Sequence, residues 1–274
     1  MITEIHFLNS LMPLLYLSTV IVYFYDLIFE GSKFYNSKRV FLFITVFIHI
    51  IYLSLRIIEF QHTPITNKFE ILTLISLCLS ISYFILELLT DFSRTGLLPI
   101  IFSFLFQLIS SIFISDQINI PAILSSTVFG AHVIGSVLGY SSITIATIYS
   151  IVYLLQYYNL KNNKFSLIYR KMPNLEVLEK LIYNSFVIAS IFHSISIIVG
   201  LRYAYTGLPN FQIFDPKFII SMMIWFIFIV GISLKIFKKL FGKGIIKIVL
   251  IIFCLILISL FIPNNFMNSF HIFI

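Results

Sequence analysis

The chain has 274 residues, of which 59% are hydrophobic and 11% charged, and its formal net charge is +7. A mean hydropathy of +1.04 excludes an ordinary soluble domain, in which about a quarter of the residues are charged. The basic excess does not indicate a nucleic-acid-binding protein, because the Lys and Arg residues flank long apolar segments, where they set membrane orientation.

Eight segments are apolar and long enough to cross a bilayer, whose hydrocarbon core of about 30 Å needs about 20 helical residues. In chain order they are predicted at residues 7–29, 40–58, 69–89, 97–114, 126–156, 181–201, 218–236 and 245–262. The apolar runs are continuous, unlike the alternating strands of about 10 residues in a membrane barrel. The sequence therefore predicts an all-α polytopic membrane bundle, with residues 1–274 in one transmembrane domain.

The distribution of basic residues predicts the orientation of these spans. With the N-terminus outside, only Arg56, Lys68, Arg202 and Lys217 lie on the outer side, and the other fourteen of the eighteen Lys and Arg residues lie inside. The positive-inside rule then puts both termini outside. No Lys or Arg precedes the first span, so no removable signal peptide is predicted. We expect a multi-pass protein of the bacterial inner membrane, in contact with anionic lipid.

Most histidines fall at the outer face of this topology. His132 and His271 lie at the outer ends of the fifth and eighth spans, and His6 and His62 also lie outside. Two imidazoles on one membrane surface could hold one iron from opposite sides, although histidines at helix ends are common. His132 and His271 are therefore candidate ligands of haem iron.

Two further histidines fall within spans. His49 lies in the second span and His193 in the sixth. Ionisable residues inside a membrane are rare and are often functional. Each imidazole could be a haem ligand or part of a proton relay, or a neutral ring that is hydrogen-bonded to a neighbouring helix. The sequence leaves these alternatives open.

Other kinds of chemistry receive little support. The sequence contains no HExxH, GxSxG or Walker A motif. Asp26, Glu59 and Glu87 lie near span ends, where we expect them to reach water, and symmetric broken helices are missing, so a small-molecule permease is the weakest hypothesis. Cys78 and Cys254 are expected to pack as small apolar residues.

Three stretches resemble one family. His62 to Glu70 (HTPITNKFE) resembles a G-H-x-P-L-S-N-x-Y-E-S segment, and Ala131 to Lys161, with AHVIGSVLGY and YLLQYYNLK, resembles a helix with H-V, L-G-Y and Y-L-L-Q-E-R-x-L-K. Asn210 to Trp225 is similar to a Trp-rich W-D-P-K segment, and Ser269 to His271 to a terminal G-L-H-S-Y. These motifs, over residues 40–271, are similar to those of the CcsA/HemX group of cytochrome c assembly proteins, which handle haem in system II cytochrome c maturation.

The resemblance implies roles for individual residues. His132 and His271 would be the two external haem ligands, His49 the intramembrane histidine, and Asp215 the acidic residue of the Trp-rich motif. Phe211 and Phe214 stand where tryptophans are expected and could pack on a porphyrin face. Phe218 replaces a glutamate, and Ser233 falls where a second intramembrane histidine would lie, for which His193 is a possible substitute. With these departures from the family pattern, the chain resembles the HemX-like branch of the group.

The sequence leaves two main hypotheses for function. The first is a haem-handling membrane protein of c-type cytochrome biogenesis, which presents haem at the outer face to an apocytochrome c brought by a partner protein. The second is a HemX-like regulator or scaffold that is not an enzyme, with the basic inner segment 157–180 as its contact surface. In neither case does the chain form the thioether bonds of cytochrome c by itself.

Overall fold

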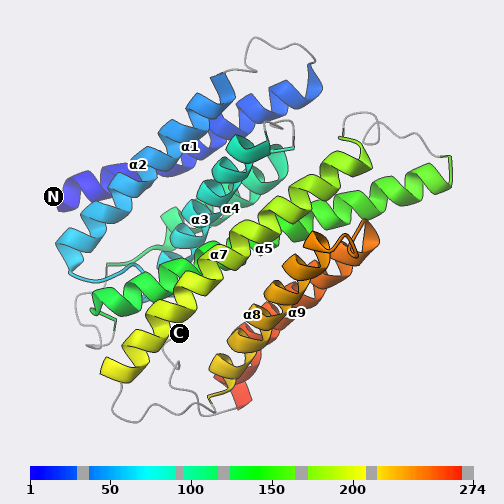
Figure 1. Cartoon of the computed structure of the whole chain (residues 1–274). Coiled ribbons are helices and arrows are strands. Elements are labelled where there is room, and N and C mark those ends of the chain that lie inside the picture. Colours follow the sequence, from blue (N-terminus) through cyan, green and yellow to red (C-terminus); the bar gives the residue numbers. More distant parts are fainter. Residues whose placement is uncertain (30–36, 91–94, 117–123, 164–171, 208–214, 267–274) are drawn as a thin grey trace. The chain divides into compact units, whose positions relative to one another are not determined.

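The spans predicted from the sequence are α-helices in the structure. The computed structural model describes residues 1–29, 37–90, 95–116, 124–163, 172–207 and 215–266. Over these residues the chain forms eight helices and no strand (Figure 1). Each predicted span coincides with one helix, so the all-α prediction is confirmed. Among the described helices six are long and apolar enough to cross a membrane, and a seventh, Leu97–Phe113, is apolar but shorter.

The chain divides into two units, residues 1–130 with 170–172 and residues 131–169 with 173–274. Unit 1 contains α1 (Ile2–Ile28), α2 (Ser37–Phe60), α3 (Lys68–Thr90) and α4 (Leu97–Phe113). Helix α1 packs on α2 and α4, and α3 packs on the same two helices. The result is a four-helix bundle. The expectation of one transmembrane domain for the whole chain stays a prediction.

Unit 2 is built from α5 (Thr127–Lys161), α7 (Leu175–Gly207), α8 (Pro216–Ile236) and α9 (Lys243–Phe266). Helix α7 packs on both α8 and α9, which pack on each other. At 35 and 33 residues, α5 and α7 are about 50 Å long, well beyond the hydrocarbon thickness. Both extend past the predicted span ends, because the residues that follow the apolar core are polar enough for water and still form helix.

Side-chain caps fix where several helices begin. Asn67 Oδ1 accepts hydrogen bonds from the amides of Phe69 and Glu70, at 3.0 and 2.9 Å, at the start of α3. Asn174 Oδ1 accepts from the Val177 amide, at 2.9 Å, at the start of α7. These bonds satisfy amides that have no partner within the helix. The caps explain why the chain turns into helix at these residues.

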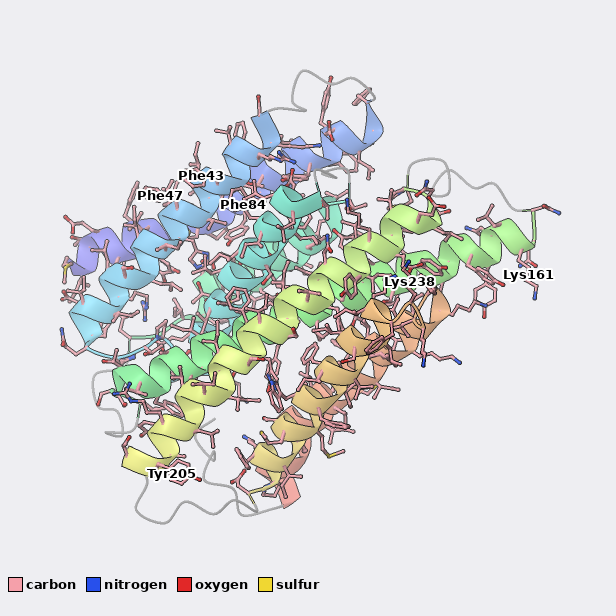
Figure 2. The ribbon with its side chains drawn as sticks, in the orientation of Figure 1. Phe43, Phe47, Phe84, Lys161, Tyr205 and Lys238 are labelled. Atoms are coloured by element: carbon pink, nitrogen blue, oxygen red, sulfur yellow. The ribbon has the colours of Figure 1, made fainter. Side chains whose placement is uncertain are left out.

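The outer surface of the bundles is apolar, and much of the interior of unit 1 is polar. Phe43 and Phe47 project from α2 and are about half exposed, as Figure 2 shows. In contrast, Asp26, His49 and Glu70 are buried. An apolar exterior suits contact with lipid, whereas buried polar groups are costly and must be paired.

Candidate functional site

His132 of α5 is held against α7 within unit 2. Its Nδ1 lies 2.8 Å from the carbonyl oxygen of Ser196 and 3.1 Å from Ser196 Oγ. A carbonyl only accepts hydrogen bonds, so Nδ1 carries the proton and Nε2 carries the lone pair. Histidines that bind metals usually donate their other ring N–H to a carboxylate or a backbone carbonyl. The ring is only partly buried, and in its neutral form this is the tautomer that a metal ligand at Nε2 needs.

Small residues on α5 and α7 make this position possible. A Cβ atom on Gly200 would lie 2.5 Å from His132 Nδ1 and 2.7 Å from Cε1, so glycine at this position leaves room for the ring where it stands. Ser196 Oγ donates to the carbonyl of His132 at 2.9 Å and lies 2.5 Å from Ser136 Oγ. A Cβ on Gly135 would come within 3.2 Å of the Ser196 side chain. Ser196 and Gly200 were not predicted from the sequence as site residues, although small residues at helix spacing are typical of close helix packing in membranes.

His193 is anchored at one nitrogen only. Its Nε2 donates to the carbonyl of Ser221 on α8, at 3.1 Å, and its ring lies beside Tyr140 and Phe228, with centroids 6.1 and 5.8 Å away. The Nδ1 atom is buried and has no hydrogen-bond partner among the described residues. The ring therefore makes the interhelical hydrogen bond that was one of the two alternatives, and leaves one lone pair unused.

Four further residues of the predicted haem site fall into two groups, those outside the described residues and one that the structure describes. Phe211, Phe214 and His271 lie outside the described residues, so their roles stay predictions. Asp215 is buried and caps α8, since its Oδ1 accepts from the amides of Lys217 and Phe218, at 2.9 and 3.3 Å. This cap, followed by a proline at the first helical position, accounts for Asp-Pro at this point of the sequence.

His49 lies fully buried in unit 1. Its Nδ1 is 2.8 Å from the hydroxyl of Tyr16, and its Nε2 is 2.9 Å from Oγ1 of Thr73. Both ring nitrogens are thus engaged with neighbouring helices. The structure agrees with the hydrogen-bonded alternative for this residue, and iron could bind only after one of these bonds is broken.

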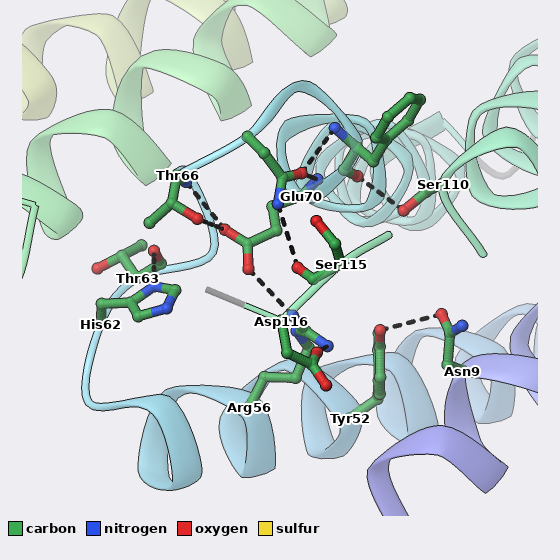
Figure 3. A network of polar contacts seen from close by, with 12 residues as sticks. Asn9, Tyr52, Arg56, His62, Thr63, Thr66, Glu70, Ser110, Ser115 and Asp116 are labelled. Atoms are coloured by element: carbon green, nitrogen blue, oxygen red, sulfur yellow. Dashed lines mark hydrogen bonds and ion pairs between the residues drawn. The ribbon is translucent and has the colours of Figure 1, made fainter. Parts of the chain in front are cut away.

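At the end of unit 1 that contains the start of α1, a buried arginine joins two carboxylates (Figure 3). Arg56 donates to Glu70 Oε1 and to Asp116 Oδ1, each at 3.0 Å. Glu70 also accepts from the amide and hydroxyl of Thr66, at 2.9 and 2.7 Å. From the sequence alone Arg56 is only a topology signal, because no local pattern shows that residues 14 and 60 positions away supply its partners.

The opposite end of unit 1 corrects one prediction. Asp26 and Glu87 were expected to reach water, but both are buried. Asp26 pairs with Lys38, and Glu87 accepts from Tyr23 at 2.5 Å and from Arg39 at 3.2 Å. Side chains of the described helices, and not water, stabilise these two buried carboxylates. The expectation that they reach water was therefore wrong.

These features define a polytopic membrane protein that has a histidine hydrogen-bonded between two helices in unit 2 and a polar interior in unit 1. Among the described residues, no three His, Cys, Asp or Glu side chains come together as a metal site. Residues 65–271 match the family described as cytochrome C assembly protein. The chain therefore belongs to this family, and with it to the membrane proteins of cytochrome c biogenesis or haem handling.

Two relatives carry the same name. The chain is 25% identical to Protein HemX of Brevibacillus brevis over 228 residues, which cover 81% of this chain and 82% of that protein. It is 26% identical to Protein HemX of Bacillus subtilis (strain 168) over 120 residues, or 44% of each chain. The family match begins in the segment between α2 and α3, so α1 and α2 precede it.

Proposed function

We propose that this protein holds haem at the end of unit 2 that is predicted to face outside, with His132 as one of the residues that would bind the iron. The observation that carries the proposal is the hydrogen bond from His132 Nδ1 to the carbonyl of Ser196. It orients the ring and gives Nε2 the lone pair that iron requires. His271 would be the second ligand, as in the family that the sequence resembles.

The neighbouring residues would position the ring and cover the porphyrin. The Ser196 carbonyl keeps the ring in one tautomer, and Gly200 leaves the space that the imidazole occupies. Phe211 and Phe214 would pack on the porphyrin face, with Asp215 beside them at the start of α8. Haem, when bound, would supply the iron that the two histidines hold. A partner protein would bring the apocytochrome c that receives it.

The proposal is tested by optical spectroscopy of the purified full chain from cells supplied with haem. We expect a Soret and α band typical of bis-histidine ligation, and loss of this spectrum in His132→Ala and in His271→Ala. His6→Ala is the matched control, because His6 is an exposed histidine of unit 1. Unchanged haem content and unchanged bands in both test variants would contradict the assignment.

A second candidate function is a HemX-like regulator or scaffold that carries no haem. It is favoured by Phe at positions 211 and 214, where the resemblance expects Trp, and by Ser233 in place of a histidine. Its contact surface would be the basic segment 157–180. A full chain purified without any chromophore from haem-supplied cells, together with a partner captured through this segment, would favour this function over haem presentation.

A further inference from the structure

The connection between α8 and α9 concentrates positive charge at one end of unit 2. Residues 235–247 contain no Asp or Glu but five lysines, namely Lys235, Lys238, Lys239, Lys243 and Lys247. Helix α8 has 21 residues and is apolar enough to cross a membrane. It is about 30 Å long, which matches the hydrocarbon core. Its last residues therefore lie at a membrane surface, the inner one in the orientation predicted from the sequence.

Two of the five lysines are held by contacts within unit 2. Lys235 Nζ lies 2.7 Å from Glu179 Oε1 of α7 and 4.8 Å from the centroid of the Phe241 ring. Lys243 Nζ lies 3.7 Å from the centroid of the Tyr157 ring of α5. Carboxylates and aromatic faces are favourable partners for an ammonium group. These two lysines are thus part of the helix packing.

The residues that join α8 to α9 are fixed against α5 and α7. The Gly242 amide donates to Glu179 Oε2 at 2.9 Å, so one carboxylate binds both Lys235 and the backbone of the turn. Gly242 has a φ of 49°, and a Cβ there would lie 3.0 Å from the hydroxyl of Tyr153. A left-handed backbone and a close neighbour both favour glycine. The turn therefore has a defined position.

The other three lysines face away from these contacts. Lys238, Lys239 and Lys247 are exposed, and over the part of the chain that the structure describes none of them pairs with a carboxylate. Lys247 follows the first residue of α9 by four positions, or about one helical turn. Long lysine side chains at such positions extend to the headgroup layer. Three positive charges at this surface are thus available to a ligand.

Lys238 adopts a backbone conformation that lysine rarely takes. Its φ is 55°, and it ends α8 in a turn in which its own amide donates to the carbonyl of Lys235 at 3.0 Å. The next amide, that of Lys239, donates to the carbonyl of Leu234 at 2.9 Å. Glycine is the usual left-handed residue of this helix-ending motif. Helix termination alone therefore does not account for a lysine at position 238.

Exposed apolar side chains belong to the same turn. Ile236, Phe237 and Phe241 are 67, 72 and 59% exposed. Apolar groups beside lysines are typical of segments at the boundary between headgroups and acyl chains, where each kind of side chain finds a favourable partner. A water-soluble acidic protein or a nucleic acid would account for the lysines but not for these three side chains. The combination favours a lipid.

We propose that the α8–α9 turn (residues 236–242) is a binding site for the headgroup of an anionic phospholipid. Lys238 and Lys239 bind the phosphate, and Lys247 contributes positive charge from the first turn of α9. Phe237 packs against the acyl chains of the same leaflet. An ammonium group near an anionic membrane surface contributes about a 5-fold increase in affinity. The two phosphate-binding lysines together therefore contribute about 25-fold.

This site is separate from the proposed haem site. Helix α8 begins at Asp215, which belongs to the predicted haem site, and the lipid site is at the other end of the same helix. No residue is shared between them. The lipid proposal therefore does not rest on haem binding, and either proposal can fail without the other.

The test is native mass spectrometry of the purified full chain in detergent. The chain is titrated with phosphatidylglycerol or with phosphatidylcholine of the same acyl chains, and the dissociation constant of the first bound lipid is measured. The test variant combines Lys238→Gln with Lys239→Gln. The matched control combines Lys161→Gln with Lys180→Gln, because these lysines are also exposed in unit 2 and lie on the same predicted side of the membrane.

A second variant separates lipid binding from folding. Lys238→Gly places the usual residue at a left-handed position, so we expect a protein at least as resistant to thermal unfolding as the wild type. The same change removes one phosphate-binding charge and should weaken phosphatidylglycerol binding about 5-fold. A Lys238→Gly protein that binds this lipid as tightly as the wild type would overturn the proposal.

We expect the wild type to bind phosphatidylglycerol more tightly than phosphatidylcholine. The test variant should lose about 25-fold in affinity for phosphatidylglycerol and keep its affinity for phosphatidylcholine, whereas the control should bind both lipids like the wild type. Equal affinity of the wild type for the two lipids would contradict the site. Equal losses in the test variant and the control would also contradict it, because the preference would then come from the total charge of the inner side.

Discussion

Gly200 and the imidazole of His132 occupy adjoining space so closely that any side chain at position 200 would force the ring to move. A Cβ there would stand 2.5 Å from Nδ1, which is the nitrogen that donates to Ser196. Gly200→Ala should push the ring away from this carbonyl and release its orientation. We expect haem affinity to fall about 10- to 100-fold, as for other residues that orient a metal ligand, in a haem titration of the purified protein.

The control for this variant is Ile198→Ala, which changes an exposed residue of the same helix and should leave the titration unchanged. A Gly200→Ala protein that binds haem with wild-type affinity and an unaltered spectrum would show that the position of the His132 ring is unimportant for binding.

The ion cluster of unit 1 should respond differently to single and double substitution. Arg56→Met leaves Glu70 and Asp116 without their buried partner, so we expect the free energy of unfolding to fall by about 3–5 kcal/mol. Arg56→Met combined with Glu70→Leu removes both members of the fully buried pair and should recover a large part of the loss. Thermal or denaturant unfolding in detergent measures both values. A double variant less stable than the single variant would contradict this account.

The spans could be predicted from the sequence because their signal is local: each needs only about 20 consecutive apolar residues. The pairing of polar groups could not, since it depends on distant residues. A hydropathy average does not distinguish Glu87, which is buried against Tyr23 and Arg39, from a carboxylate that reaches water. The His132 tautomer likewise depends on Ser196, which is 64 positions away. The predicted topology and the resemblance both pointed to His132, and only the fold showed how it is held.

Tyr16 should contribute to stability through its hydroxyl. Tyr16→Phe keeps the ring but leaves His49 Nδ1 buried without its hydrogen-bond partner, and an unsatisfied buried polar group costs about 1–3 kcal/mol. We expect a loss of unfolding free energy in this range. Tyr158→Phe, at an exposed tyrosine of α5, is the control and should be close to neutral. Equal stabilities of the two variants would mean that the bond to His49 contributes nothing.

Asp215 offers a way to separate helix capping from charge. Asp215→Ala removes the acceptor for the amides of Lys217 and Phe218, and we expect it to destabilise the protein by about 1 kcal/mol. Asp215→Asn retains an oxygen that can cap α8 and should stay within a few tenths of a kcal/mol of the wild type. Unfolding in detergent measures the two free energies. An Asn variant as unstable as the Ala variant would contradict the capping role, because the carboxylate charge, and not the acceptor oxygen, would then be what α8 requires.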